Sequence, residues 1–511
     1  MLGDGAELAL IDLREELIFS RSHLLWARNV PLSRLELRFA RLVPRRATRI
    51  VLIDDNEGLC ARAAEILARA GYSDLSYLAG GTAAWEAAGF ELFSGVHVPS
   101  KAFGEFIEHA SHTPSISADE LNAHMRAGTD MVVLDSRPYD EYSRVSIPTG
   151  INVPGAELVL RVHDIAPSPA TLIVVNCAGR TRSIIGAQSL INAGVPNKVV
   201  ALRNGTMGWH LAGLTCDHGK DKSAPGLSGA GLAWAKSKAA EVARRFDVAR
   251  TDRAALARWQ SDATRTTYLF DVRDPAEYQA GHLPGAISAP GGQLVQATDL
   301  YAGTLGARIV LSDDNEVRAV MTASWLRQMG WQDVAVLPEA GKKSEQETGT
   351  PPGLVLGTAP ADASVEFSDV LAIDDVTVID LSRSPDYRKG HIPGAWFAIR
   401  SRLAQALAKI SQHGTLVLTS EDGVLAGLAA AETQTLTAIP VRWLKGGNAA
   451  WAAAGFPLST DVKMADEPLD VWLKPYERPG DPKAAMNEYL SWEIDLLTRI
   501  KRDGTTHFTA P

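Results

Sequence analysis

The chain has 511 residues, of which 46% are hydrophobic, and this length predicts roughly three to five domains rather than one core. Its 51 basic and 60 acidic residues give a net charge of −9 without a basic tract, which argues against nucleic acid as a partner. No run of about 18 apolar residues occurs, so no membrane span and no membrane partner are expected.

Two further features bear on the cellular compartment. The N-terminal stretch MLGDGAELALIDLREEL lacks the basic start and the apolar run of a secretory signal. Three cysteines, Cys60, Cys177 and Cys216, are too few for a disulfide framework. We therefore expect a cytoplasmic protein whose thiols stay reduced.

Four related stretches occur along the chain, and each begins as a short apolar strand that ends in an aspartate. They are LIDLREELIFSRSH from Leu10, VLDSRPYDEYSRVS from Val133, LFDVRDPAEYQAGH from Leu269 and VIDLSRSPDYRKGH from Val378. The strand-ending residues are Asp12, Asp135, Asp271 and Asp380, and 11 residues after them stand His23, Ser146, His282 and His391. A charged segment with helical character follows each strand, so the stretches are copies of one repeat.

A second apolar strand in each repeat ends at a turn. These strands and turns read IVLIDDNEG, LIVVNCAGR, RIVLSDDNE and TLVLTSEDG, and the equivalent turn positions are Asp54, Cys177, Asp313 and Ser420. The first three positions lie 42 residues after their aspartates and the fourth lies 40 residues after its own. This constant register supports the repeat.

A helical stretch follows each turn, for example RSIIGAQSLINAG after Cys177. Three repeats then close with a turn and a tryptophan, at Trp85, Trp209 and Trp451, whereas the third has LPEAGKKSEQ. The alternation of strands and helices predicts an α/β fold with four small, mainly parallel β-sheets, each flanked by helices.

The repeat boundaries predict five segments. We expect domains at residues 1–97, 112–218, 245–348 and 362–460, and a C-terminal extension at 461–511. The stretches FSGVHVPSKAFGEF, HGKDKSAPGLSGAG and ETGTPPGLVLGTAPADAS are rich in Gly, Pro and Ser and are interpreted as linkers. Residues 233–246 are expected to form a helix. Residues 489–504 are expected to form an amphipathic helix that packs on a neighbouring domain, with a homodimer contact as the alternative.

The repeated motifs resemble those of the rhodanese (thiosulfate sulfurtransferase) family. The resemblance lies in the Asp-x-Arg strand ends (Asp135 to Arg137, Asp271 to Arg273), in EYQAGHLPGAI and DYRKGHIPGAW, in the cysteine turn and in the GGxxAW endings. It covers about residues 5–460 and implies a tandem protein of four rhodanese-like domains, only one of which keeps the cysteine. The resemblance also implies that the histidine of the other repeats is structural, because the cysteine repeat has Ser146 instead.

The cysteine turn has the composition of an anion-binding nucleophile. In parallel α/β sheets ligands bind beyond the carboxyl ends of strands, where Cys177 is expected, and a helix starts a few residues later. Backbone N–H groups at such a turn favour an anion or a thiolate. We therefore interpret Cys177 as catalytic, with Arg180 and Arg182 adding positive charge. The substrate-binding residues are expected to be Ala178, Gly179, Arg180, Thr181, Arg182 and Ser183.

The resemblance implies a two-step transfer of sulfane sulfur. Cys177 takes sulfur from thiosulfate, releases sulfite and passes the sulfur from its persulfide to cyanide or a small thiol; no metal and no organic cofactor are needed. Three alternatives stay open: 3-mercaptopyruvate as the donor, a cysteine phosphatase, and a non-catalytic scaffold or sulfur-binding protein. The phosphatases that resemble this fold need Cys-x5-Arg, whereas Cys177 and Arg182 give Cys-x4-Arg.

Other residues receive structural interpretations. Gly179 is the third residue of a loop in which the family commonly has glycine fourth, so the cradle is expected to differ in shape. Arg137 and Glu141 are expected to pair with each other, and Cys60 and Cys216 are expected to pack, with persulfide resolution as an alternative for Cys216. The DDNE segments of the first and third repeats (Asp54 to Glu57, Asp313 to Glu316) lack a nucleophile, repel anions and are expected to cap their helices.

Overall fold

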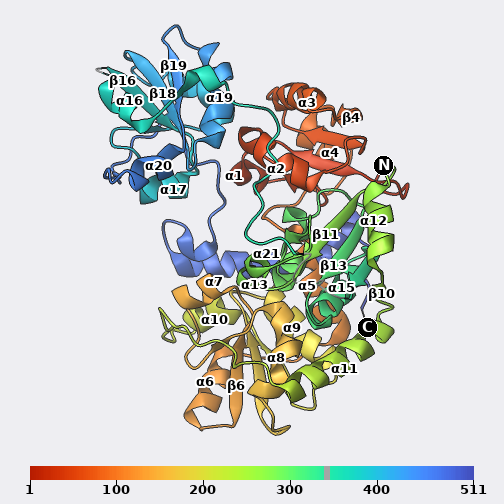
Figure 1. The fold of residues 1–511 in the computed structure, drawn as a ribbon. Coiled ribbons are helices and arrows are strands. Elements are labelled where there is room, and N and C mark those ends of the chain that lie inside the picture. The colour runs from red at the N-terminus through yellow and green to blue at the C-terminus, as the bar shows by residue number, and fades with distance from the viewer. Residues whose placement is uncertain (339–345, 374, 511) are drawn as a thin grey trace. The chain divides into compact units, whose positions relative to one another are not determined.

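The computed structural model describes residues 1–338, 346–373 and 375–510 and separates into two compact units (Figure 1). One unit consists of Met1–Leu8, His97–Pro351 and Leu473–Pro511 and holds the second and third repeats. The other consists of Ala9–Val96 and Pro352–Trp472 and holds the first and fourth repeats.

The second repeat forms a five-stranded parallel sheet in the order β5-β9-β8-β6-β7. Its strands are β5 (Ser115–Ile116), β6 (Met131–Asp135), β7 (Ile151–Asn152), β8 (Leu172–Asn176) and β9 (Val199–Leu202). Its helices are α6 (Ala118–Arg126), α7 (Tyr139–Arg144), α8 (Leu158–Ile165), α9 (Thr181–Asn192) and α10 (Gly205–Leu211), with the 3-10 turn η2 (Gly155–Glu157). The strand β8 lies at the centre of this sheet and ends directly before Cys177.

The third repeat has the same strand order, β10-β14-β13-β11-β12, again parallel throughout. Its strands are β10 (Ala249–Arg250), β11 (Thr267–Asp271), β12 (Ile287–Ser288), β13 (Arg308–Ser312) and β14 (Val334–Leu337). Its helices are α12 (Arg253–Ser261), α13 (Pro275–Ala280), α14 (Gly291–Gln296) and α15 (Val317–Gln328), with the 3-10 turn η3 (Thr298–Leu300). A continuous buried core joins this domain to the second one.

The unit that holds the first and fourth repeats contains two further parallel sheets, in the orders β2-β1-β3-β4 and β15-β19-β18-β16-β17. The strands of the first are β1 (Ala9–Asp12), β2 (Arg28–Asn29), β3 (Ile50–Ile53) and β4 (Leu75–Tyr77); those of the fourth are β15 (Ser364–Val365), β16 (Val376–Asp380), β17 (Trp396–Phe397), β18 (Thr415–Thr419) and β19 (Val441–Leu444). The helices are α1 (Glu16–Phe19), α2 (Leu35–Leu42), α3 (Leu59–Arg69), α4 (Gly81–Ala87), α16 (Phe367–Ala372), α17 (Ser384–Lys389), α18 (Leu403–Leu407), α19 (Val424–Gln434) and α20 (Gly447–Ala453), with the 3-10 turns η1 (Leu32–Arg34), η5 (Ala361–Ala363) and η6 (Arg400–Arg402).

The four parallel sheets flanked by helices confirm the predicted α/β fold (Figure 1). The strands β1, β6, β11 and β16 end at the four aspartates of the repeat, and the central strands end directly before the four equivalent turn positions. The interior positions of the central strands are apolar because helices cover both faces of the sheet, as is usual where strands are parallel.

Three segments between and after the sheets form long helices. They are α5 (Val98–Ser111), α11 (Gly229–Arg245) and α21 (Pro482–Asp503), the last preceded by the 3-10 turn η7 (Pro475–Glu477). The helices α11 and α21 confirm the predicted helices, and α21 packs against α5. Residues 93–106, interpreted as a linker, contain the start of α5, and this helix buries Val98, Phe103 and Ile107 completely.

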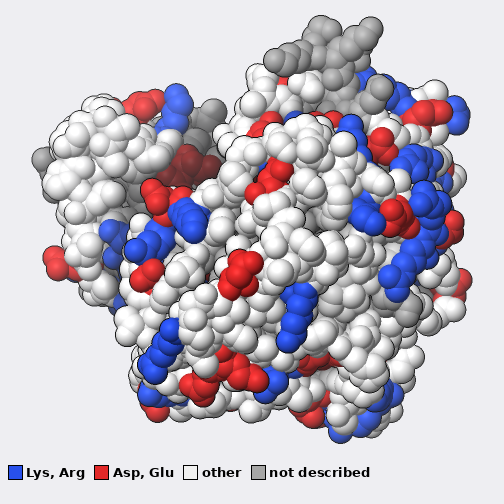
Figure 2. Space-filling view, turned by 90° about the horizontal axis from the view of Figure 1, so that it is seen from below, with Lys and Arg blue, Asp and Glu red and all other residues white. Residues whose placement is uncertain are grey.

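Three further predictions concern the ending of the third repeat, membrane spans and nucleic-acid binding. Most of LPEAGKKSEQ, the divergent ending of the third repeat, lies outside the described residues. Among the helices that are described, none has both the length and the apolar character that a bilayer crossing requires. On the face seen in Figure 2, basic and acidic side chains are interspersed over the described atoms, without the continuous basic track typical of a nucleic-acid site.

Candidate active site

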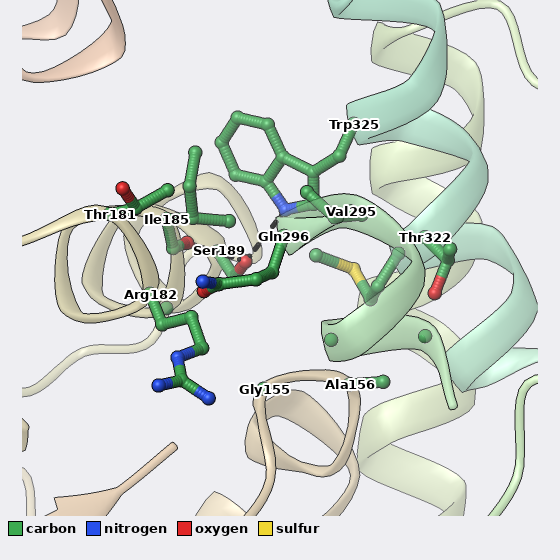
Figure 3. Close-up of a pocket in the computed structure, with 14 residues that line it drawn as sticks. Gly155, Ala156, Thr181, Arg182, Ile185, Ser189, Val295, Gln296, Thr322 and Trp325 are labelled. Atoms are coloured by element: carbon green, nitrogen blue, oxygen red, sulfur yellow. Dashed lines mark hydrogen bonds between the residues drawn. The ribbon is translucent and has the colours of Figure 1, made fainter. Parts of the chain in front are cut away.

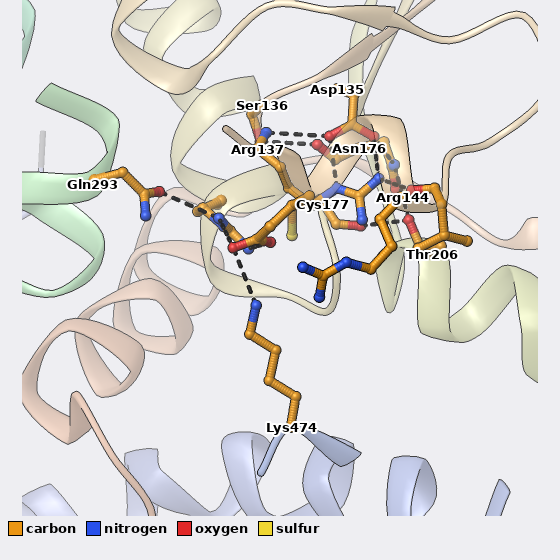
Figure 4. Close-up of polar contacts among 12 residues, drawn as sticks. Asp135, Ser136, Arg137, Arg144, Asn176, Cys177, Thr206, Gln293 and Lys474 are labelled. Atoms are coloured by element: carbon orange, nitrogen blue, oxygen red, sulfur yellow. Dashed lines mark hydrogen bonds and ion pairs between the residues drawn. The ribbon is translucent and has the colours of Figure 1, made fainter. Parts of the chain in front are cut away.

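The cysteine turn of the second domain connects the central strand β8 to the helix α9. Cys177 follows directly after β8, and α9 begins at Thr181, so residues 177–183 form a short loop and the first helical turn. Cys177 is 2% exposed and therefore lies at the base of this loop rather than on the protein surface (Figure 4). We call residues 177–183 the cysteine loop.

The backbone N–H groups of the cysteine loop are free to bind an anion. The first intrahelical bond of α9 runs from the N–H of Ile184 to the carbonyl oxygen of Arg180 at 3.1 Å. Within the described part of the chain, no acceptor is hydrogen-bonded to the N–H groups of residues 178–183. The start of an α-helix leaves such donors unpaired and carries partial positive charge.

The equivalent loops of the other three domains supply their own acceptor. In the first domain the Asp54 carboxylate accepts from the N–H groups of Asn56 (3.0 Å) and Cys60 (3.1 Å). In the third, Asp313 accepts from Glu316 (2.5 Å), Arg318 (2.9 Å) and Ala319 (3.3 Å). In the fourth, the Ser420 hydroxyl accepts from Ala426 (3.3 Å). The side chain at this position therefore reaches the N–H groups of its loop, and in the second domain it is a thiol.

Arg180 is held away from the loop by carboxylates of α5. Its guanidinium forms a bidentate pair with Glu105, with both N–O distances 2.7 Å, and also contacts Glu108 and the Asn204 side chain (3.2 Å). Burial lowers the pKa of Arg180, but the Glu105 carboxylate more than compensates and raises it above its usual value. The guanidinium, 8% exposed, thus fixes the loop to α5.

Arg182 lies on the other side of the loop and is only partly neutralised. It pairs with Glu141 at 2.8 Å and donates to the side-chain oxygen of Gln293 from the third domain at 3.3 Å. Glu141 also pairs with Lys474 at 3.3 Å (Figure 4). Although burial raises the pKa of Glu141, Arg182 and then Lys474 lower it far below its usual value. Burial lowers the pKa of Arg182, but Glu141 and then Cys177 more than compensate and raise it above its usual value, so the guanidinium and the thiol interact electrostatically.

The other predicted loop residues have defined contacts. The Ala178 carbonyl oxygen accepts from the N–H of Met207 at 2.9 Å, and the Ser183 hydroxyl donates to the Arg180 carbonyl oxygen at 2.8 Å. Gly179 lies beneath α21. Thr181 approaches α5 so closely that a Cβ on Gly104 would come within 2.9 Å of its methyl carbon.

The predicted pairing of Arg137 with Glu141 is wrong. Arg137 forms a bidentate pair with Asp135, at 2.8 and 2.7 Å, because the two side chains share the end of β6 (Figure 4). Asp135 also accepts from the amide of Asn176 at 2.9 Å, which fixes the residue before Cys177. Glu141 is left to pair with Arg182 and Lys474.

The NGT turn at the start of α10 supports the cysteine loop from the opposite side. The N–H and the hydroxyl of Thr206 both donate to the carbonyl oxygen of Cys177, at 2.8 and 3.0 Å. Gly205 has a φ of +54°, and a Cβ there would lie 2.4 Å from that same oxygen. Only glycine fits this approach.

Sequence reasoning missed the residues of α5 and α21 that cover the loop. A Cβ on Gly179 would stand 3.2 Å from Glu493 Oε2 and 3.5 Å from the ring of Tyr489. Lys101 of α5 contacts the Tyr489 hydroxyl and lies 3.3 Å from Glu493 Oε1. Burial, with the Glu493 carboxylate, raises the pKa of Tyr489 well above its usual value. The only available signal was the amphipathic pattern of 489–504, which does not identify its contacts.

A small cavity separates the back of α9 from the third domain (Figure 3). It is lined by Arg182, Ile185 and Ser189 of α9 and by residues of α14 and α15, among them Trp325, whose indole donates to Ser189 at 2.8 Å. Its volume of about 30 Å³ admits one or two water molecules and no larger ligand. The third domain therefore contacts the helix that follows the cysteine loop, through α14 and α15.

The other two cysteines have different surroundings. Cys60 is 7% exposed within the core of the first domain, and burial together with Asp54 raises the pKa of its thiol to about 12. Cys216 is partly buried against the apolar cluster around Trp209, and burial raises its pKa as well. Both thiols therefore remain protonated near neutral pH.

Comparison with known proteins identifies the family. Residues 1–88, 117–212, 252–341 and 365–454 match the sequence model of the rhodanese-like domain. The crystal structure of thiosulfate sulfurtransferase from Pseudomonas aeruginosa is 49% identical, with a TM-score of 0.96 over 100% of this chain and 97% of its own. The HTH-type transcriptional regulator Rv0324 of Mycobacterium tuberculosis is 32% identical over 105 residues, which span 20% of this chain and only 45% of the regulator.

The four matched segments cover well over half of the 511 residues, and each contains the central strands of one of the four sheets. The chain therefore belongs to the rhodanese family, as a tandem member with four rhodanese-like domains of which the second carries the loop cysteine.

Proposed function

We propose that this protein is a rhodanese-type sulfurtransferase that moves sulfane sulfur from thiosulfate to cyanide or a thiol through a persulfide on Cys177. The observation that carries the proposal is the cysteine loop itself. In three domains an Asp or Ser oxygen at the loop position accepts hydrogen bonds from the N–H groups of its own loop. In the second domain the residue at this position is a cysteine, which is a nucleophile. The 49% identity to a protein named thiosulfate sulfurtransferase supports the same reaction.

In the first step the Cys177 thiolate attacks the outer sulfur of thiosulfate. A new S–S bond forms to Cys177, the S–S bond of thiosulfate breaks, and sulfite leaves with the electron pair. The loop N–H groups stabilise the thiolate before the attack and the terminal persulfide sulfur after it, because both are anions at a helix N-terminus. In the second step cyanide or a thiolate takes the outer sulfur, and Cys177 leaves again as a thiolate.

Within the loop, we assign donor binding to the backbone N–H groups of 178–183 and to the side chain of Arg182. Arg180 contributes through its backbone N–H, because its guanidinium is already paired with Glu105 and Glu108. Two more exposed cations, Lys474 and Arg144, stand near this site, since Lys474 pairs with Glu141 and Arg144 belongs to α7. They supply attraction for an anionic donor from solvent.

Two other functions remain alternatives. A sulfurtransferase that uses 3-mercaptopyruvate as its donor would need the same cysteine. It would differ from a thiosulfate sulfurtransferase only in the residues that bind the donor. A non-catalytic scaffold or sulfur-binding protein would retain the fold without turnover, and the three domains that lack a cysteine at the loop position favour this candidate. The Cys-x4-Arg spacing of Cys177 and Arg182 disfavours a phosphatase.

The deciding experiment is the mass of the intact protein after incubation with thiosulfate and removal of the excess. A gain of one sulfur, about 32 Da, is expected for the wild type and not for Cys177→Ala. Release of that sulfur as thiocyanate on addition of cyanide completes the cycle. If thiosulfate adds no mass but 3-mercaptopyruvate does, the donor assignment is wrong; if neither adds mass, the scaffold is favoured.

A further inference from the structure

A buried glutamate of the C-terminal helix presents one unpaired oxygen to the cysteine loop. Glu493 is 2% exposed, and its Oε1 accepts from the hydroxyls of Tyr489 (2.9 Å) and Thr181 (3.4 Å). Oε2 is also buried, and no residue in the described ranges hydrogen-bonds to it. It lies 3.2 Å from the place that a Cβ on Gly179 would occupy. The unpaired oxygen thus faces the loop two residues from Cys177.

Leaving this oxygen unpaired is energetically unfavourable. A buried acceptor without a partner costs about 1–3 kcal/mol, and more when the group is charged. Lys101, itself 5% exposed, balances the charge but approaches only Oε1, at 3.3 Å. The surrounding residues therefore fix the orientation of the carboxylate and keep Oε2 directed at the loop, as expected for an acceptor that serves a transient ligand.

Oε2 approaches Gly179, which is two residues from the cysteine that carries the persulfide. Cα atoms two residues apart are separated by at most about 7 Å, and a persulfide extends the cysteine sulfur by about 2 Å. Tyr489, one helical turn before Glu493, also approaches Gly179, with a ring carbon 3.5 Å from the place of a Cβ there, so this face of α21 is directed at the cysteine loop. A thiol that attacks the outer sulfur on Cys177 from the side of α21 would bring its proton towards Oε2.

We propose that Glu493 is the general base for the second half of the reaction and that the acceptor it serves is a thiol. Lys101, Tyr489 and Thr181 act as positioning residues that hold the carboxylate. This inference rests on the proposed sulfurtransferase function and adds the acceptor class. Both α5 and α21 lie outside the four segments that match the rhodanese-like domain, so this base is an addition to the common domain.

The step is balanced without any further reactant. The acceptor thiol gives its proton to Glu493 Oε2, and its sulfur forms a bond to the outer sulfur of the Cys177 persulfide. The S–S bond to Cys177 breaks, and Cys177 leaves with the electron pair as a thiolate. The acceptor departs as a persulfide, and Glu493 releases its proton to water.

The test isolates the acceptor half-reaction in the full-length protein. Cys177 is loaded with thiosulfate, the donor is removed, and the persulfide is discharged in a single turnover. Two acceptors are compared: an alkyl thiol whose pKa lies above the assay pH, and an aryl thiol whose pKa lies below it. The variants are Glu493→Gln and, as a matched control on the same helix, Glu488→Gln, whose side chain is 76% exposed.

Glu493→Gln is expected to slow discharge by the alkyl thiol about 100-fold, within the usual range for a general base, and to leave the aryl thiol within about twofold of wild type. In Glu493→Gln, loading of Cys177 by thiosulfate should be unchanged or faster, because the variant removes a negative charge near the site where the thiosulfate dianion binds. Glu488→Gln should match wild type throughout.

Equal slowing with both thiols, or no slowing with the alkyl thiol, would overturn the assignment. If Glu493→Gln does not fold, Glu493→Asp, which withdraws the carboxylate by one methylene, must slow the alkyl thiol selectively. Failure of the wild type to form a persulfide would instead refute the proposed function, so the two failures are distinct.

Discussion

The carboxylate of Asp54 accepts a hydrogen bond from the backbone N–H of Cys60, six residues later, at 3.1 Å. Asp313 and Ala319 have the same relationship in the third domain, and Ser420 and Ala426 in the fourth. In the second domain the corresponding residues are Cys177 and Ser183. The loops that lack a nucleophile are therefore closed by their own side chains, and they serve as helix caps rather than as anion sites.

Removing this cap should destabilise the first domain. Asp54→Ala is expected to lower the free energy of unfolding by about 1 kcal/mol, and by no more than about 2, as for other capping residues. Asp54→Asn keeps an acceptor oxygen and should lose less. Urea denaturation measures both variants. Equal losses for alanine and asparagine would contradict a capping role.

Arg180 is expected to contribute to stability more than to donor binding. Arg180→Met leaves the buried Glu105 carboxylate without its bidentate partner and should lower the free energy of unfolding by about 3–5 kcal/mol. The double variant Arg180→Met, Glu105→Met removes both charges and should recover most of that loss. Chemical denaturation gives the stabilities, and persulfide loading by thiosulfate tests the site.

The double variant also separates the two roles of Arg180. If the Arg180 guanidinium bound the donor, persulfide loading in the double variant would be as slow as in the single variant Arg180→Met. Loading close to wild type, together with the recovered stability, is the expected result. A double variant as unstable as the single one would show that the pair with Glu105 is not what the arginine provides.

Gly205 should tolerate no side chain. Gly205→Ala places a Cβ 2.4 Å from the Cys177 carbonyl oxygen in addition to straining a φ of +54°. We expect slower persulfide formation and a stability loss of about 2–5 kcal/mol, the sum of left-handed strain and overpacking. Gly213→Ala is the matched control, because its φ is +75° but its Cβ would meet nothing within 4 Å. Gly213→Ala should cost about 1–2 kcal/mol and leave persulfide formation intact.

A buried carboxyl of the first domain should make stability depend on pH. Glu15 is 7% exposed and accepts from Ser401 (2.8 Å) and Ser33 (3.1 Å), and burial raises its pKa from 4.5 to about 7. The folded state therefore holds a proton that the unfolded state releases between these values. Its contribution is complete below pH 4.5 and is lost as the pH rises through 7, by up to about 3 kcal/mol.

Glu15→Gln removes that dependence. Thermal unfolding is measured at several pH values from about pH 5 to about pH 8. Raising the pH over this range should lower the transition temperature of the wild type more than that of the variant. The difference between the two proteins isolates Glu15 from the other titrating groups. Parallel pH profiles would mean that the carboxyl is ionised in the folded protein as it is in the unfolded one.

The repeat made the sheets predictable. Strand ends and turns recur at a constant spacing, so one recognisable cysteine turn located the three divergent ones, and the structure places strand ends at Asp12, Asp135, Asp271 and Asp380. Strand pairing in such a sheet follows from local apolar runs and short connections, both of which are visible in a single sequence.

The surroundings of the loop were not predictable in this way. The Gly and Pro residues near 99–104 suggested a linker, yet Pro99 lies in the first turn of α5, where proline is tolerated, and Gly104 permits contact with Thr181. Arg180 looked free because its partner Glu105 is 75 residues away. The contacts of Lys101 with α21 join residues nearly 400 apart, and no local pattern encodes them.

The long stretch of sequence between Lys101 and Glu493 affects the order in which the site forms during synthesis. Lys101 and Glu493 are 392 residues apart, so a ribosome making roughly 5–20 residues per second needs about 20–80 s to supply the second after the first. During that interval the second domain can fold while its sulfur site still lacks the C-terminal helix. The completed site is thus delayed until α21 has been synthesised and has left the ribosome, long after the second domain can fold.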